Sequence, residues 1–111
     1  MGKRCISQES LNSTGFSYTL SLINGKYKMT ILYTLMEFGA VRFNEMKKYI
    51  GSISYKTLST TLKELEADQL VNRKEYPQIP PKVEYSLTER GKSLIPILDN
   101  MCEWGENHRI L

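Results

Sequence analysis

The sequence predicts a small, mainly α-helical domain that carries one β-hairpin. Hydrophobic residues recur at spacings of three and four along most of the chain, which is the period of an amphipathic helix. The period changes to alternation only near residues 82–87, where a strand is expected. With 111 residues, of which 41% are hydrophobic, the chain is long enough for one domain with a modest core.

Two helices are expected before residue 40. Residues 16–23 form a short apolar segment that ends at Asn24 and Gly25, a turn dipeptide. A second helix follows and ends at Gly39, a residue suited to a left-handed helix cap. The inward face of this second helix is expected to consist of Tyr27, Ile31, Leu32 and Leu35.

A helix-turn-helix is predicted over residues 43–67. The first helix spans residues 43–50 and is ended by Gly51. The second helix is capped by Ser54, so that only a few residues connect the two helices, as in a helix-turn-helix. Its inward face is expected to consist of Leu58, Leu62 and Leu65. Ile53 and Leu58 then occupy the two positions of a hydrophobic staple.

The second of these helices carries its charges in an unusual order. A carboxylate near a helix N-terminus is normally favourable by about 0.3 to 1 kcal/mol, yet Lys56 occupies the first turn and the acids come at the end. Between Arg42 and Lys63 the sequence has five basic residues and one acidic residue, Glu45. This segment therefore carries a charge of +4, whereas the whole chain has a net charge of +3. This distribution favours an external polyanion such as a duplex phosphate backbone over an ordinary solvated face.

A β-hairpin is predicted directly after this helix. Residues 70–76 are expected to be extended, the segment 77–81 contains three prolines that forbid a helix, and residues 82–87 alternate. A hairpin in this place is the wing of a winged helix-turn-helix. Its bases, Arg73, Lys74 and Lys82, are candidates for contacts with phosphates or a minor groove.

The last segment is expected to be one helix that begins at the N-cap Thr88 and is kinked near Lys92 by Pro96. Its apolar stripe indicates a partner helix from a second subunit, although Trp104 could instead pack in the core of its own subunit. The residues predicted for this dimer interface are Leu94, Leu98, Met101 and Trp104. The single His108 is interpreted as an ordinary terminal side chain.

These motifs together resemble the HxlR-type family of bacterial winged helix-turn-helix regulators. The resemblance spans about residues 20–105 and rests on GKYKMTIL, GAVRFNEM, ISYKTLSTTLKELEADQLV, IPPKVEYSLTERG and the closing EWG. It implies a homodimer that is joined through its N- and C-terminal helices and binds a pseudo-palindromic operator. One departure is Tyr27, because the family commonly has tryptophan there.

The expected organisation is a single winged helix-turn-helix domain over residues 1–111. It divides into an N-terminal arm and helix (1–24), a winged helix core (25–87) and a C-terminal dimerisation helix (88–111).

The two cysteines allow different interpretations. Several members of the family that the chain resembles are similar to thiol-based or electrophile sensors with one cysteine near the N-terminus, and Cys5 matches that location. Its neighbours Lys3 and Arg4 would lower the pKa of the Cys5 thiol if they stay close, but an inert terminal cysteine is the alternative. Cys102 is interpreted as a small hydrophobe. Two cysteines and one histidine give no recognisable metal site, and no cofactor is expected.

The function predicted from the sequence is a DNA-binding transcriptional regulator, in particular a repressor that binds double-stranded DNA as a homodimer. The residues predicted to contact DNA are Arg42, Lys48, Ser54, Tyr55, Lys56, Thr57, Ser59, Thr60, Lys63 and Lys82. Of these, Ser54 is primarily a cap, and Arg42 could instead pair with Glu45. The alternative function is a winged helix that binds an acidic protein.

An enzyme is disfavoured, because the chain has no glycine-rich phosphate loop and no histidine with an obvious carboxylate partner. No secretory signal or membrane span is found, so a cytoplasmic protein is expected. The sequence does not identify an effector.

Overall fold

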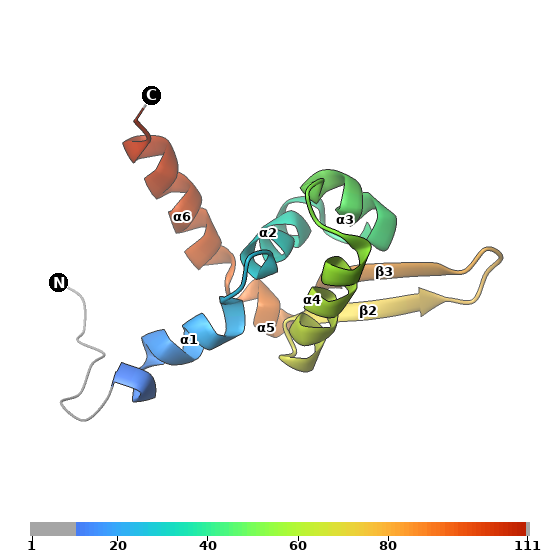
Figure 1. The fold of residues 1–111 in the computed structure, drawn as a ribbon, viewed down its shortest axis with the longest axis horizontal. Coiled ribbons are helices and arrows are strands. Elements are labelled where there is room, and N and C mark those ends of the chain that lie inside the picture. Colours follow the sequence, from blue (N-terminus) through green and yellow to red (C-terminus); the bar gives the residue numbers. More distant parts are fainter. Residues whose placement is uncertain (1–10, 111) are drawn as a thin grey trace.

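The computed structural model describes residues 11–110 and is built from helices around a small antiparallel sheet (Figure 1). In chain order the elements are η1 (Leu11–Ser13), α1 (Gly15–Ile23), α2 (Lys28–Phe38), β1 (Val41–Arg42), α3 (Phe43–Ile50), α4 (Tyr55–Ala67), β2 (Val71–Tyr76), β3 (Lys82–Leu87), α5 (Glu89–Lys92) and α6 (Ile95–His108). The mainly helical fold with a β-hairpin, predicted from the sequence, is confirmed.

The sheet has three strands in the order β1-β3-β2, and both pairings are antiparallel. Strands β2 and β3 form the predicted hairpin, with Val71 opposite Leu87 at its base and Tyr76 opposite Lys82 near its tip. The hairpin extends away from the helices as a wing (Figure 1). Strand β1 pairs Val41 with Tyr85 and was not predicted, because two residues are too few to show an alternation.

The core lies between α2, α3, α4 and the sheet. It is formed by the fully buried side chains of Ile31, Leu32, Leu35, Val41, Met46, Ile53, Leu58, Leu62, Leu65 and Leu70. The inward face predicted for α4 is therefore confirmed, because its three leucines are all buried. In α2 the predicted inward residues are buried except Tyr27, which packs half-buried at the margin of the core.

The single kinked helix predicted after Thr88 is wrong, because the chain breaks into α5 and α6 at Ser93 and Leu94. Proline lacks a backbone N–H, and a helix tolerates it in the first turn, where that N–H would have no intrahelical partner. Pro96 occupies this place in α6. The proline therefore begins a new helix where a kink in a continuous helix was expected.

Helices α1 and α6 project from the core on the side opposite the wing (Figure 1). The Arg90 guanidinium connects α1 to the core, since its Nη2 donates to the Tyr18 hydroxyl at 2.7 Å and its Nε to the Asp68 carbonyl at 3.1 Å. No helix within residues 11–110 is long and apolar enough to cross a membrane.

Candidate nucleic-acid interface

The turn between α3 and α4 sets the position of the candidate reading helix. Gly51 has a φ of 74°, which favours glycine, and it ends α3 as predicted. Ser54 then caps α4, because its Oγ accepts from the Thr57 backbone N–H at 3.1 Å. Ile53 and Leu58 are both buried beside this cap. The predicted cap of α4 is thus confirmed, and α4 is held in place from its first turn.

The polar face of α4 is uncovered by the described part of the chain. Lys56, Thr60 and Lys63 are exposed on this face, and Ser59 is half-buried at its edge. The first turn of α4 holds no acidic residue. Thr57 is also exposed, but its hydroxyl accepts a hydrogen bond from Ser54 Oγ at 2.9 Å. The face therefore offers hydroxyl and ammonium groups to the outside, and Thr57 is already engaged in the cap.

Tyr55 borders this face and leans toward α3. Its ring stacks with that of Phe43 at a centroid distance of 6.1 Å, and 61% of Tyr55 remains exposed. The Lys47 ammonium lies 5.1 Å from the Tyr55 ring centroid. These contacts restrict the orientation of Tyr55 and bring a further positive charge to the α3 side of α4.

Arg42, Lys48 and Lys82 line one hollow between the start of α3 and the wing. The carboxylate of Glu45 does not pair with the Arg42 guanidinium, because it accepts from the Arg42 backbone N–H at 2.9 Å. Arg42 and Lys48 are exposed. The structure thus places the three predicted phosphate-contacting residues together, with two of the three cations open to solvent.

The third cation, Lys82, is held within the wing. Its ammonium pairs with Glu84 at 3.1 Å and lies 4.7 Å from the ring centroid of Tyr76. Hydrogen bonds from Lys82 and from the Tyr76 hydroxyl to Glu84 place the pKa of this carboxyl below its ordinary value of 4.5. In this arrangement a phosphate bound by Lys82 shares the ammonium with Glu84.

Residues 72–75 of β2 and the tip of the wing are exposed. Arg73 pairs with Glu75 at 3.4 Å, and Lys74 lies 5.0 Å from the Tyr76 ring centroid. At the tip, Ile79 is entirely exposed between the prolines. Lys74 on the wing is therefore open to a phosphate. The apolar side chain of Ile79 at the tip is not covered by any described residue.

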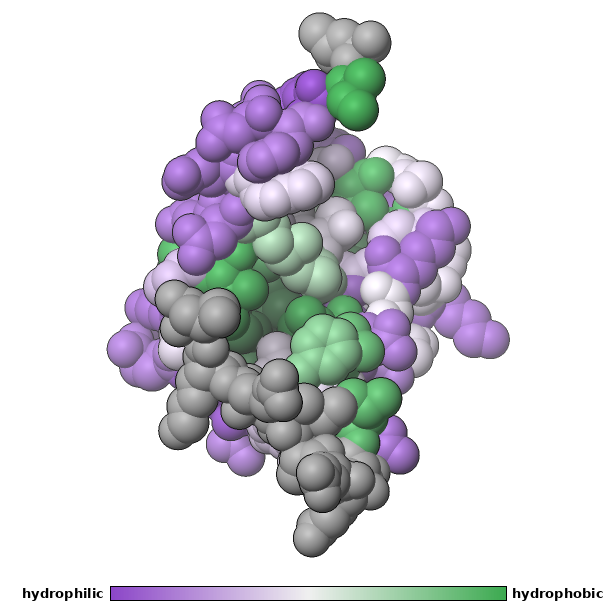
Figure 2. Space-filling view, turned by 90° about the vertical axis from the view of Figure 1, so that its left-hand side faces the viewer, coloured by the Kyte–Doolittle hydropathy of each residue, from purple (hydrophilic) through white to green (hydrophobic). Residues whose placement is uncertain are grey.

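A second surface, of different character, covers α1 and α6. Figure 2 shows hydrophobic residues gathered on this side of the molecule. The exposed large side chains there are those of Phe16, Tyr18 and Leu20 from α1, and Ile97, Met101 and Trp104 from α6. Sequence reasoning did not single out the α1 residues, although the apolar run at 16–23 was the available signal.

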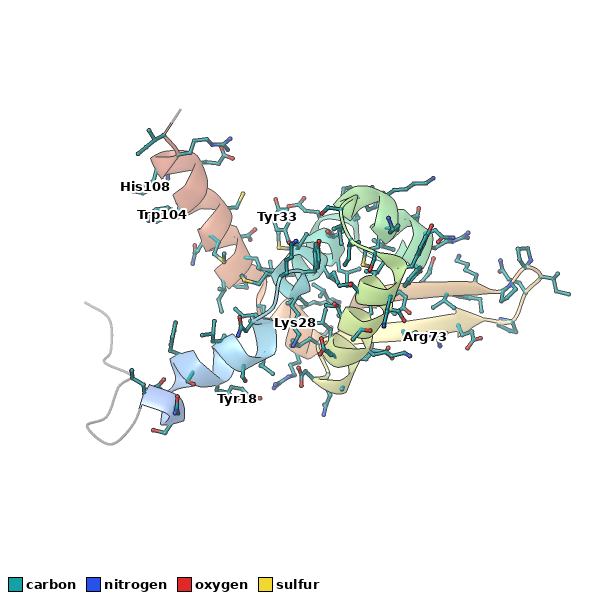
Figure 3. The ribbon with its side chains drawn as sticks, in the orientation of Figure 1. Tyr18, Lys28, Tyr33, Arg73, Trp104 and His108 are labelled. Carbon is teal, nitrogen blue, oxygen red and sulfur yellow. The ribbon has the colours of Figure 1, made fainter. Side chains whose placement is uncertain are left out.

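The four residues predicted for a dimer interface take two orientations. Met101 and Trp104 are exposed, and the Trp104 ring stacks with His108 at a centroid distance of 4.4 Å (Figure 3). Leu98 is buried at 6% exposure against its own core, and Leu94 packs half-buried beside it. Met101 and Trp104 are therefore available to a partner, while Leu94 and Leu98 anchor α6 to its own subunit.

Of the two cysteines, Cys5 lies outside the described residues. Cys102 is exposed on α6, in a hollow that it shares with Tyr33 and Met29 of α2. Its Sγ lies 4.0 Å from the Tyr33 hydroxyl oxygen, and this contact with Cys102 raises the pKa of Tyr33. The interpretation of Cys102 as a small hydrophobe omits this polar contact.

Two adjacent helices with a capped second helix and a following hairpin define the class of winged helix-turn-helix transcriptional regulators. The HxlR-like helix-turn-helix family model matches residues 22–110, which is most of the chain. The chain belongs to this family, and it is a transcriptional regulator of the helix-turn-helix type.

Known proteins agree with this assignment. An HTH-type transcriptional regulator of Halalkalibacterium halodurans is 62% identical over 97 residues, which cover 87% of this chain and 86% of the relative. The solved structure of the redox regulator HypR in its reduced form is 47% identical, covers 86% of this chain and 94% of its own, and has a TM-score of 0.82. The reduced regulator YodB from Bacillus subtilis is 34% identical over 86% of this chain and 93% of its own, with a TM-score of 0.73.

Proposed function

We propose that this protein is a homodimeric repressor that recognises a pseudo-palindromic operator in double-stranded DNA. The observation that carries this proposal is the polar face of α4, which is uncovered, basic and free of acids in its first turn. A duplex major groove is about 12 Å wide and admits one helix. The family is one of helix-turn-helix transcription regulators, which supports the choice of DNA as partner.

In the proposed complex the N-terminal half of α4 lies in the major groove. Tyr55, Lys56, Ser59 and Thr60 contact base edges, while Lys63 lies one turn further along the same face. Arg42, Lys48 and, through its shared ammonium, Lys82 bind phosphates and fix the register. Ser54 and Thr57 act mainly through the cap that holds the helix start.

The proposed dimer is formed by the exposed apolar surface of α1 and α6. A second copy of this surface would cover Met101 and Trp104, which a monomer leaves in water. A two-fold dimer presents two α4 helices to successive major grooves at about 34 Å. A dimer bound to the operator would exclude RNA polymerase and so repress transcription. A protein with this function would act in the cytoplasm of a prokaryotic cell.

Thiol sensing through Cys5 is a finer part of the proposal. Its support is the likeness to HypR, which is called a redox regulator, and to YodB, whose solved structures include a diamide-treated form. Diamide should change the operator affinity of the wild type and leave that of Cys5→Ser unchanged. An equal response of both proteins would remove Cys5 from the proposal.

The substitution Lys56→Ala tests the reading helix. We expect it to weaken operator binding by about 1 to 3 kcal/mol and to relax the base preference at one position, because one contact with a base edge is lost. Fluorescence anisotropy measures both effects, with the duplex that the wild type selects from a random pool as operator and with its single-base variants. Lys92→Ala is a matched control, since Lys92 is exposed on α5 and pairs with Glu89.

Retention of full base preference by Lys56→Ala would remove Lys56 from the reading set. The alternative, a winged helix that binds an acidic protein, predicts weak and sequence-independent duplex binding. The salt dependence of binding distinguishes the two functions. For B-DNA the log of the affinity falls with the log of the salt concentration by about 0.9 for each phosphate contact.

A further inference from the structure

A second basic hollow lies beside α4, and the proposal above gives no role to its lysines, Lys26 and Lys28. It is lined by Lys26 of the turn between α1 and α2, by Lys28 at the start of α2, and by Ser54 and Thr57 at the start of α4. Figure 3 shows Lys28 beside α4. Its volume is comparable to that of the hollow lined by Arg42, Lys48 and Lys82. Because Ser54 and Thr57 line it, the hollow lies next to the start of the reading helix.

The two lysines are not neutralised by the described residues. Within residues 11–110 neither Lys26 nor Lys28 forms an ion pair with a carboxylate. Lys26 is exposed, with its ammonium 5.3 Å from the Tyr27 ring centroid, and Lys28 is half-buried. The acid that lines this hollow is Glu64, about 15 Å along α4 from Ser54 at a rise of about 1.5 Å per residue.

The turn that carries these lysines is fixed against the helix-turn-helix. The Tyr27 hydroxyl donates to the Ser52 carbonyl at 3.4 Å, which joins the start of α2 to the turn between α3 and α4. Tyr27 is also the position at which this chain departs from the tryptophan common in the family it resembles. This contact holds the backbone that carries both lysines next to the start of α4.

The hollow lies on the other flank of α4 from the hollow lined by Arg42. At about 3.6 residues per turn, Ser54, Thr57 and Thr61 share one flank of α4, and Tyr55 and Ser59 share the opposite one. Tyr55 faces α3 through its stack with Phe43. In Figure 1 the turn between α1 and α2 lies on one side of α4 and the wing on the other.

We propose that Lys26 and Lys28 bind the phosphates along one edge of the major groove, while Arg42, Lys48 and Lys82 bind those along the other. A helix in the major groove has a phosphate strand on each side, and the two basic hollows flank α4 in the same way. The reading helix is thereby held from both edges. This inference rests on the proposed function, because it requires α4 to enter a duplex.

The test is the salt dependence of operator binding by the full-length variants Lys26→Gln, Lys28→Gln and their combination. Anisotropy titrations between about 50 and 200 mM salt give the slope of log affinity against log salt. Each single variant should reduce the slope by about 0.9 and the double variant by about 1.8, with the base preference unchanged. Lys92→Gln is the control for the loss of one charge, and it should keep the wild-type slope.

Two further variants separate phosphate binding from a structural role. The double arginine variant, Lys26→Arg with Lys28→Arg, should keep the wild-type slope because both charges remain. Tyr27→Phe should weaken binding several-fold and keep the slope, because the lysines stay charged but lose their fixed position. Equal melting temperatures of all variants and the wild type show that the fold is retained.

The inference is overturned if the wild type binds its operator with a steep slope and the double glutamine variant binds with the same slope and affinity. A wild type that binds no duplex would overturn the proposed function, and this inference with it. The two failures are thus distinguished by the wild-type titration alone.

Discussion

The winged core buries its hydrophobic side chains, whereas the two terminal helices leave most of theirs exposed. In the core, Ile31, Leu32 and Leu58 are completely buried. Helix α1 buries no side chain, and α6 buries only Leu98, although both helices carry large apolar residues such as Phe16 at 68% and Trp104 at 64% exposure. The core is complete within one chain, whereas the terminal helices present a surface that a second chain can cover.

The largest expected difference between the two regions is in the cost of removing a leucine side chain. Leu58→Ala should lower the free energy of unfolding by about 2 to 5 kcal/mol, because it leaves a cavity among fully buried residues. Leu20→Ala on α1 should lower it much less at protein concentrations that favour the monomer, since Leu20 is exposed there. Urea unfolding of both variants measures the difference. Equal losses would show that α1 belongs to the same cooperative core.

The next prediction concerns association. Trp104→Ala should weaken the dimer by about 2 kcal/mol or more, because aromatic residues at the centre of an interface carry much of its binding energy. Sedimentation should show a shift toward monomer, and operator binding should lose its cooperativity. Ile79→Ala is the matched control, because Ile79 is an exposed apolar residue on the wing, far from α6. An unchanged dimer in Trp104→Ala would exclude this surface as the interface.

Replacing a glycine by alanine should have a smaller effect on stability, with opposite signs in the two regions. A Cβ on Gly91 of α5 would lie 2.2 Å from the Leu70 carbonyl oxygen, so Gly91→Ala should destabilise the core by about 1 to 3 kcal/mol. Apart from its chain neighbours and the backbone of α6, no atom of the described structure lies within 4 Å of such a Cβ on Gly105. Gly105→Ala should raise stability by about 0.5 to 1 kcal/mol through helix propensity.

Thermal unfolding of the two glycine variants gives both signs in one experiment. Destabilisation by Gly105→Ala that grows with protein concentration would place Gly105 inside a close helix contact of the dimer. Stability of Gly91→Ala equal to the wild type would contradict the close approach of α5 to the Leu70 backbone.

Local signals in the sequence were sufficient for the parts of the fold that they specify. The Ser54 cap, the leucines of α4 and the hairpin all depend on residues close together in the chain, and the structure has them as predicted. Strand β1 escaped prediction because its pairing with β3 joins residues far apart in sequence, such as Val41 and Tyr85. The break before α6 escaped because Pro96 suits both a kink and a first helical turn.

The candidate site shows the same division. The polar face of α4 follows from its helical period, because Lys56 and Thr60 lie four residues apart on the side opposite the leucines. The apolar stripe of α6 could not show which of its residues face the core of the same subunit. Only the structure shows that Leu98 is buried there and that Trp104 is exposed. Lys26 gave no signal, because its place beside α4 depends on the contact between Tyr27 and Ser52.

The most direct test of the account is the selection of bound sequences from a random duplex pool by the full-length protein. A core that reads DNA and terminal helices that form a two-fold dimer together predict an enriched site with two inverted half-sites. Their centres should lie about 10 base pairs apart, the spacing of successive major grooves on one side of the duplex. Enrichment of no sequence, or of a single half-site without symmetry, would contradict the account.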